Sequence, residues 1–362
     1  MEKTVDESPA ILYTKILILQ TAFIGDVVLV TPLVRAVYDC FPAAEIHFLT
    51  IPASQNLVET LPFIKKLWIF DKRGKDDGIR GLLKLARRLR QEKFQLALVP
   101  HRSLRSSLLV FLAGIPRRIG FNRSSSAFLF TDRVIYQHSL HEVERNLSLL
   151  QPLHLQLPEK ILPEIYLNNQ DKEQVTWWLK NSGIDKNSPF ITLAPGSVWF
   201  TKRWPAGYWA ELADLLRKEN YKIILIGSSE DKYLASEIIP DSTASIIDAF
   251  GRFTLRQSAE LIRRSRLLIS NDSAPTHLGS AVRTPVLTIF GSTIPSFGFS
   301  PCSTGSRVAE IMNLPCRPCT DHGKMKCPLE HFKCMRELTP AIVFEIVRKM
   351  LNVYSLDRSN KN

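Results

Sequence analysis

Residues 271–281, NDSAPTHLGSA, bring an acid, hydroxyls, a proline and a histidine into one short turn. The turn follows the apolar run RLLIS at 266–270 and precedes a helical pattern of small residues. Small residues let a helix pack closely on a sheet, and its free N-terminal amides bind anions. A capped turn would need fewer polar groups. We therefore predict a nucleotide-diphosphate site formed by Asp272, Ser273, Ala274, Pro275 and His277.

A second candidate site follows the first strand pattern, in QTAFIGDVVLVTP at 20–32. Gly25 permits a tight turn from strand to helix, and Asp26 lies where the helix starts. Asp26 has two interpretations. It is either a cap that accepts free amide protons, or a general base that faces a cleft. The segment lacks the GxGxxG spacing of a dinucleotide-binding fingerprint.

Two further loops carry residues suited to a nucleotide ligand. In GSVWFTKRWP at 196–205, Lys202 is either ordinary surface charge or a point charge that binds a diphosphate. Gly227 and Ser228 follow the apolar run at 221–226. They form either a plain capped turn or a place where a ribose or base approaches the backbone.

All these candidates follow short apolar runs that alternate with helical patterns. The predicted strands are 15–19, 45–50, 64–70, 94–100, 117–121, 189–196, 221–228, 266–270 and 285–291. The main helical patterns are 27–41, 81–93, 204–220 and 339–354. This alternation indicates βαβ units and mainly parallel sheets, whose ligands bind beyond the carboxyl ends of the strands.

The strand–helix pattern restarts after a stretch centred near 160–188, so the α/β chain divides into two doubly wound, Rossmann-like domains. We place the first domain at residues 1–170 and the second at 171–338. A length of 362 residues is sufficient for two separate cores. The natural ligand site of such a pair is the cleft between the two sheets.

Charge and hydropathy narrow the classes of partner. The net charge of +12 implies an anionic partner, but does not choose among nucleotides, phosphorylated glycans, membrane surfaces and nucleic acids. The polar N-terminus has no signal-peptide layout, and no apolar run reaches the roughly 18 residues of a membrane span. We therefore expect a cytoplasmic protein with reduced thiols.

The ordered segments GDVVLVTP, PGSVWFTKRWP, GSSEDKYLASEI, NDSAPTHLGSA and FGSTIPSFGFSP resemble the ADP-heptose:lipopolysaccharide heptosyltransferases of glycosyltransferase family 9. The likeness covers residues 15–350, and the second heptosyltransferase type is the most similar in the KRWP and NDS segments. The resemblance implies a GT-B fold, with the acceptor on the first domain and the nucleotide-sugar on the second. It also implies that the final helix, 339–354, crosses back to the first domain.

The same resemblance assigns roles to single residues. Asp26 falls on the family's proposed base, and Lys202 on the lysine that contacts the donor diphosphate. Ser197 and Phe253 fall near positions that line the donor nucleotide, and 272–277 on the donor-binding turn. The implied reaction inverts the anomeric centre without a metal or other cofactor. These loops contain no DxD-type pair that would hold a divalent ion.

Four cysteines crowd into one stretch near the C-terminal helix, at Cys316, Cys319, Cys327 and Cys334. A CxxC pair followed by two thiols is compatible with a structural zinc site. The inner spacings are not those of a standard zinc finger, so we favour free thiols or redox-labile pairs and keep a structural zinc as the alternative.

The segment 79–91 has apolar residues at 79, 82, 83, 86 and 89, with basic residues between them. This pattern is typical of a helix that packs on a sheet, and the alternative is contact with anionic lipid or a phosphorylated sugar. Further cations at 100–107 and 116–126 lie in the domain assigned to the acceptor.

The leading hypothesis is transfer of heptose from ADP-L-glycero-D-manno-heptose to the lipid A-core of lipopolysaccharide, at the cytoplasmic face of the inner membrane. A rival keeps the fold with another donor or acceptor. Sugar-nucleotide 2-epimerases form another class, which would need further cleft acids and histidines. A basic nucleic-acid binder with a zinc–cysteine cluster is the non-enzyme alternative, but the basic residues are dispersed without an aromatic-studded motif.

Overall fold

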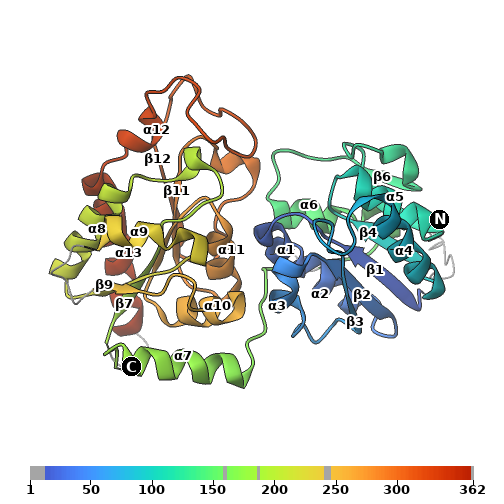
Figure 1. Ribbon diagram of the computed structural model, residues 1–362, viewed down its shortest axis with the longest axis horizontal. Helices are drawn as coiled ribbons and strands as arrows, with labels where there is room; N and C mark the ends of the chain where they lie inside the picture. Colours follow the sequence, from blue (N-terminus) through green and yellow to red (C-terminus); the bar gives the residue numbers. More distant parts are fainter. Residues whose placement is uncertain (1–12, 158–160, 186–187, 240–245, 360–362) are drawn as a thin grey trace, which may run out of the picture.

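The computed structural model describes residues 13–157, 161–185, 188–239 and 246–359, with side chains through Asn352. Two six-stranded parallel sheets form two domains that lie side by side (Figure 1). This arrangement confirms the predicted α/β fold class. The first sheet lies within residues 15–134 and the second within 190–310.

The first sheet has the strand order β3-β2-β1-β4-β5-β6. Its strands are β1 (Lys15–Leu19), β2 (Glu45–Thr50), β3 (Lys66–Ile69), β4 (Leu96–Val99), β5 (Arg117–Phe121) and β6 (Asp132–Val134). Its helices are α1 (Ile24–Leu29), α2 (Thr31–Cys40), α3 (Gln55–Val58), α4 (Gly78–Gln91), α5 (Leu104–Leu112) and α6 (Glu142–Ser148).

The second sheet has the order β12-β11-β10-β7-β8-β9. Its strands are β7 (Phe190–Ala194), β8 (Lys222–Leu225), β9 (Ile246–Asp248), β10 (Leu268–Asn271), β11 (Val286–Phe290) and β12 (Arg307–Glu310). The helices that follow the first domain are α7 (Asn169–Asn181), α8 (Ala206–Lys218), α9 (Tyr233–Ile238), α10 (Leu255–Arg264), α11 (Ala274–Ala281), α12 (Lys333–Arg336) and α13 (Pro340–Ser359).

Strand order reverses once in each sheet, between β1 and β4 and between β7 and β10. At such a switch point the loops that follow the two strands diverge to opposite faces, which leaves a crevice at their carboxyl ends. Asp26 follows β1, Lys202 follows β7, and Asp272 follows β10. The topology therefore places three predicted site residues at the two switch points.

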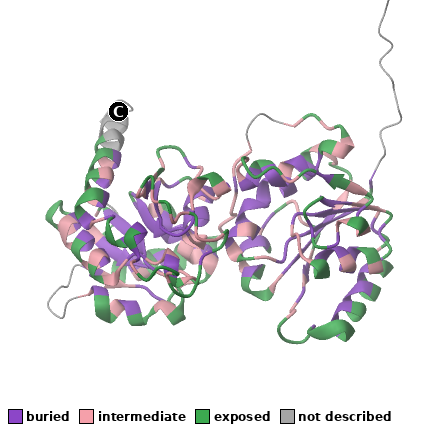
Figure 2. Ribbon diagram, turned by 90° about the horizontal axis from the view of Figure 1, so that it is seen from above, coloured by how far each residue is buried: buried purple, intermediate pink, exposed green. Residues whose placement is uncertain are grey.

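Both faces of each sheet are covered, because parallel strands carry apolar side chains on both sides. In β1, Ile16 and Ile18 join a cluster shared by the two domains, whereas Leu17 and Leu19 pack under α4 and α5. The shared cluster extends to Leu278 of α11. Figure 2 shows the buried residues concentrated on the strands and on the inward sides of the helices.

The segment 27–41, predicted as one helix, is two helices that meet at Val30. Pro32 lies in the first turn of α2, where its missing amide hydrogen costs nothing. Helix α4 buries Leu82, Leu85 and Leu89 against the sheet, which confirms the sheet-packing interpretation of 79–91. Three short strands, β6, β9 and β12, were not predicted.

The expectation that the final helix packs on the first domain is wrong for the part whose side chains are described. Val343, Val347 and Met350 of α13 are buried in the core of the second domain, and α13 packs on α8. Figure 1 shows α13 on the side of the second domain that is remote from the first. The apolar spacing fixed which face of the helix is buried, but not against which sheet.

None of the helices, over the residues described, combines the length and hydrophobicity needed to cross a membrane.

Candidate active site

Asp26 lies in the first turn of α1, three residues after the helix N-cap. Its Oδ2 accepts a hydrogen bond from the amide of Phe23 at 3.1 Å, so the carboxylate does act as a cap. Burial raises the pKa of Asp26 above its ordinary value, against smaller lowering effects of the Phe23 amide, His322 and Arg102. A carboxylate with a raised pKa is a better proton acceptor. The geometry therefore supports the cap and leaves the general-base role chemically open.

Lys202 and Asp272 form an ion pair at the switch point of the second sheet. The Lys202 Nζ lies 2.6 Å from Asp272 Oδ2, and 14% of the lysine side chain is exposed. The hydroxyl of Thr293 donates to the same Asp272 oxygen at 2.7 Å. Asp272 is buried, so its carboxylate holds the ammonium beside the turn that precedes α11. This arrangement suits a cation that meets the diphosphate of a donor.

Asn271, which had not been predicted as a site residue, fixes the loop that carries Lys202. Its Nδ2 donates to the carbonyl of Pro195 at 2.7 Å, and its Oδ1 accepts from the amide of Trp204 at 3.1 Å. The side chain is fully buried. It therefore joins the carboxyl end of β10 to both ends of the loop 195–204. The only sequence signal was its place beside Asp272.

The turn before α11 is shorter than predicted, because the helix already begins at Ala274. Ser273 is the N-cap and Pro275 lies in the first turn. The Ser273 hydroxyl donates to backbone carbonyls. It accepts no hydrogen bond from the first amides of α11 and therefore does not cap the helix. Ala274 contributes no side chain beyond its methyl group. The helix start can therefore present backbone amides toward an anionic ligand.

His277 joins this turn to the first domain. Burial lowers its pKa to about 4, so the imidazole is neutral near pH 7. Its Nδ1 has no hydrogen-bond partner within the described part of the chain. A Cβ atom at Gly25 would lie 2.7 Å from the His277 ring. Gly25 therefore allows α1, which carries Asp26, to pack directly on α11.

We expect Gly25→Ala to push α1 and α11 apart, because the added methyl group overlaps the buried His277 ring. Overpacking of this kind costs about 1–3 kcal/mol, which denaturant unfolding would measure. Gly207→Ala in α8 is the matched control, since a Cβ there meets nothing within 4 Å. Equal behaviour of the two variants would contradict the close helix contact.

The remaining predicted donor residues have other partners in the structure. The Ser228 hydroxyl and amide both bond to Asp231 Oδ2, at 2.7 and 2.9 Å, as in a capped turn. Gly227 packs below the ring of Phe250. The carbonyl of Ser197 accepts from Arg203 Nε at 2.7 Å. Phe253 packs edge to face on Trp178 of α7, with ring centroids 5.0 Å apart. Their proposed contact with a nucleotide is thus supported only by their position in loops of the second domain.

All four clustered cysteines are free thiols. Across the ranges that the structure describes, no group of three or more histidine, cysteine or acidic side chains is arranged to hold a metal ion. Cys334 is buried in the core of the second domain, where burial raises its pKa to about 11. The thiol of Cys319 donates to the carbonyl of Cys316. Within the described residues, this arrangement offers no support to the zinc alternative.

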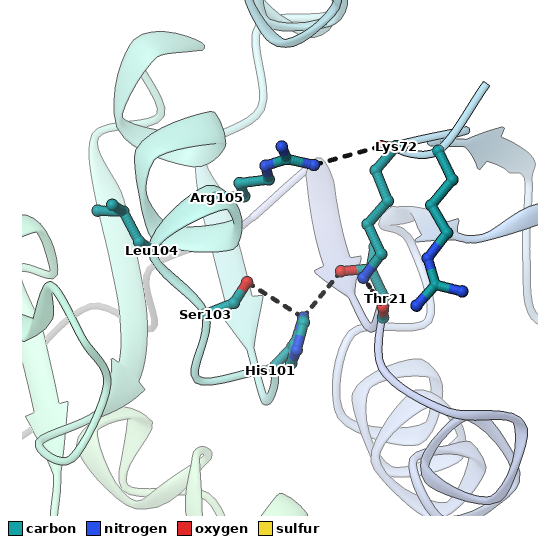
Figure 3. Close-up of a pocket in the computed structure, with 7 residues that line it drawn as sticks. Thr21, Lys72, His101, Ser103, Leu104 and Arg105 are labelled. Atoms are coloured by element: carbon teal, nitrogen blue, oxygen red, sulfur yellow. Dashed lines mark hydrogen bonds between the residues drawn. The ribbon is translucent and has the colours of Figure 1, made fainter. Parts of the chain in front are cut away.

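A basic pocket of about 430 Å³ opens at the carboxyl end of the first sheet. Figure 3 shows Thr21 after β1, Lys72 after β3, and His101, Ser103 and Arg105 after β4 around it. The His101 Nδ1 lies 2.8 Å from the Thr21 hydroxyl, and burial lowers the pKa of His101 to about 4. The cations Lys72, Arg73 and Arg105 therefore give the pocket its charge, which suits an anionic ligand.

Individual residues of this pocket had not been predicted. The cations at 100–107 were noted only as a set, and Thr21 and Lys72 carry no motif of their own. The usable signal was topological, because each of these residues follows a strand of one parallel sheet at its carboxyl end.

Two Rossmann-like domains, with candidate groups at both switch points, define the GT-B class of glycosyltransferase folds. A crystal structure of a glycosyltransferase family 9 protein from Veillonella parvula superposes with a TM-score of 0.84 at 22% identity, covering 93% of this chain and 97% of that one. The structure of Escherichia coli ADP-heptose lipopolysaccharide heptosyltransferase II gives a TM-score of 0.76 at 24% identity, covering 94% and 100%.

The sequence profile described as glycosyltransferase family 9 (heptosyltransferase) matches residues 82–332, well over half of the chain. The chain belongs to this family and is a glycosyltransferase. Lipopolysaccharide heptosyltransferase 2 of Escherichia coli (strain K12) is 26% identical over 311 residues, which are 82% of this chain and 88% of that protein. The resemblance drawn from the five sequence segments is thereby confirmed at the level of the family.

Proposed function

We propose that this enzyme transfers L-glycero-D-manno-heptose from ADP-heptose to the inner core of lipopolysaccharide, in the manner of heptosyltransferase II. The observation that carries the proposal is the contact between α1 and α11. It brings Asp26, at the first switch point, to the helix whose N-terminal turn follows the Lys202–Asp272 pair. A carboxylate suited to accept a proton thus lies on a helix of the first domain that packs on α11, the second-domain helix next to the proposed diphosphate site.

The proposed reaction is a single displacement with inversion. The acceptor oxygen forms a bond to the anomeric carbon while its proton passes to Asp26. The bond from that carbon to the diphosphate oxygen breaks, and the diphosphate takes the electron pair. Lys202 and the first amides of α11 stabilise the negative charge that develops on the leaving group. In these steps Asp26 takes up the proton, and Lys202 and the amides of α11 offset the charge on the leaving diphosphate.

The acceptor assignment rests on the basic pocket of the first domain. Its three cations lie beside the loops after β1 and β4, which also carry Asp26 and Arg102. A phosphorylated lipid A-core acceptor would match this charge. The proposed place of action is the cytoplasmic face of the inner membrane, where such an acceptor is held. Another anionic glycan acceptor, or another ADP-sugar, is the alternative within the same fold.

Calorimetric titration of the protein with ADP, UDP and GDP, without added metal, tests the donor assignment. We expect selective binding of ADP. A preference for UDP or GDP would be compatible with a glycosyltransferase but would contradict the assignment of ADP-heptose as its donor. Release of ADP from ADP-heptose in the presence and absence of lipid A-core acceptor then tests the transfer itself.

Replacing the pocket cations should weaken acceptor binding selectively. We expect Lys72→Met and Arg105→Ala to raise the acceptor KM about 10–150-fold each, since a hydrogen bond to a charged group contributes about 1.5–3 kcal/mol. The affinity for ADP should not change, because the donor site lies on the other domain. Lys84→Met, on the exposed face of α4, removes the same charge outside the pocket. A matching rise in the acceptor KM of Lys84→Met would show that the effect comes from the net charge of the protein and not from the pocket.

A further inference from the structure

A loop of the second domain, residues 294–300 after β11, reaches helix α6 of the first domain. The amide of Glu142, the first residue of α6, donates to the carbonyl of Gly298 at 2.8 Å. His141 Nε2 donates to the carbonyl of Ser300 at 2.9 Å. Figure 1 shows α6 and α1 on the side of the first domain that faces the second. The steps of the proposed reaction make no use of this contact between the domains.

Arg145 of α6 lies at the centre of the contact. Its Nη2 donates to the carbonyl of Phe297, in the second-domain loop, at 2.6 Å. Within the first domain, Nη1 donates to the carbonyl of His138 at 3.1 Å, and Nε donates to Glu142 Oε2 at 2.8 Å. Only 1% of the arginine side chain is exposed. Each nitrogen of the guanidinium is thus used inside the protein, so this cation serves the domain contact and not an anionic substrate.

Two aromatic rings, one from each domain, also contact the Arg145 guanidinium. Its Cζ lies 5.0 Å from the ring centroid of Tyr136 in the first domain and 5.5 Å from that of Phe299 in the second. Such rings attract a cation. Phe299 in turn contacts His277, with ring centroids 6.3 Å apart, and the His277 ring packs on Gly25 of α1. The second-domain loop is therefore connected both to α6 and, through α11, to α1.

The contact joins the two halves of the proposed site. On one side, Asn146 of α6 donates from Nδ2 to the carbonyl of Leu29, the last residue of α1, at 3.1 Å. On the other side, the loop 294–300 directly follows Thr293, whose hydroxyl bonds to Asp272. Opening of the contact would therefore shift the helix that carries the proposed base relative to the segment that supports the donor lysine.

We infer that Arg145 is a positioning residue for sugar transfer, because it holds the 294–300 loop of the second domain on α6 and so fixes the donor site relative to Asp26. The arginine acts through the separation of the two domains and not on the reacting atoms. Geometry of this kind matters because transfer requires the reacting atoms to be aligned at about 3–3.5 Å. The inference rests on the proposed function, since it takes Asp26 as the base and Lys202 as the donor contact.

The first test removes the arginine together with its carboxylate partner. The double variant Glu142→Gln/Arg145→Met leaves no unpaired charge buried, and proteins often tolerate such a replacement. We expect kcat at saturating ADP-heptose and acceptor to fall about 10–100-fold, since a misplacement of about 1 Å can cost that much. The affinity for ADP, measured by calorimetry, should stay within about twofold of the wild type, because distant sites act independently.

The second test acts from the other domain. Gly298 has a φ of +88°, and a Cβ atom there would overlap the carbonyl of Leu140 and lie 2.7 Å from Arg145 Nη2, both in the first domain. Gly298→Ala should therefore open the contact and lower kcat as the double variant does. Gly183→Ala is the matched control, since its φ is +69° and the nearest neighbour of the added Cβ is 4.0 Å away. It introduces similar backbone strain without a clash and should keep the wild-type kcat.

Hydrogen exchange of the Glu142 amide measures the domain contact without reference to activity. This amide bonds to the Gly298 carbonyl of the other domain, so it is protected while the contact is closed. We expect the amide to exchange at least about tenfold faster in Gly298→Ala than in the wild type, and at the wild-type rate in Gly183→Ala.

Three results would overturn the inference. The first is a near-normal kcat in the double variant, or in Gly298→Ala once the Glu142 amide exchanges fast. The second is an unchanged exchange rate of that amide in Gly298→Ala. The third is a rise in the acceptor KM of the double variant at constant kcat, which would assign Arg145 to acceptor binding. A wild-type protein without heptose transfer would contradict the proposed function, whereas the exchange rates would still decide whether the contact holds the domains together.

Discussion

Asp26→Asn should lower kcat by about 10²–10⁴-fold, the usual contribution of a general base, while ADP still binds with its original affinity. The amide of asparagine has nearly the shape of the carboxylate, and its oxygen can still accept the hydrogen bond from the Phe23 amide. The helix cap is therefore retained and the proton acceptor is lost. Transfer assays with ADP-heptose, together with ADP titration, would measure the two quantities separately.

The cap and the base can be distinguished by a second substitution at the same position. Asp26→Ala removes both functions and should also lower the free energy of unfolding by about 1 kcal/mol, as loss of a helix cap does. Asp39→Asn, in the exposed Arg35–Asp39 pair of α2, is a control for the loss of one carboxylate. If Asp26→Asn keeps near-normal kcat, then Asp26 is only a cap and the base lies elsewhere.

Lys202→Met should lower kcat by about 10²–10³-fold and weaken the binding of ADP, because charge stabilisation on a leaving group is lost. The Lys202 ammonium lies 2.6 Å from Asp272 Oδ2. Methionine fills a similar volume without the charge, so the loop 195–204 should keep its packing. Transfer kinetics and calorimetric titration with ADP would measure both effects.

Asp272→Asn tests how Lys202 is held. If Asp272 acts through the lysine, this variant should lose less than Lys202→Met, and the double variant should lose no more than Lys202→Met alone. Lys218→Met, in the last turn of α8 and exposed, controls for net charge. Unchanged ADP affinity in Lys202→Met would remove Lys202 from the donor site.

The pairing of Lys202 with Asp272 changes the interpretation of the opening motif NDSAPTH. The sequence suggested that its acid contacts the donor, whereas in the structure the buried carboxylate is used by the lysine and by Thr293. The asparagine before it holds the lysine loop. We infer that the anion meets the lysine and the start of α11, with the acid and the amide as their supports.

The sequence by itself determined the fold class, the family and most central strands. β1, β2 and β5 begin and end at the predicted residues, because buried parallel strands are continuous apolar runs between turn residues. The edge strands β6, β9 and β12 have only three or four residues, too few for a periodic signal. Asp26, Lys202 and the turn 272–277 were predicted as site residues because each combines a chemical group with a strand end.

Only the tertiary structure decided which of these groups meet and what supports them. Apolar spacing shows which face of a helix is buried, but not its partner, and so the docking of α13 was predicted wrongly. The basic pocket joins Thr21, Lys72 and His101 across three strand ends, and the buried Asn271 side chain joins the end of β10 to the loop 195–204. Such contacts depend on the path of the chain, which local sequence patterns do not contain.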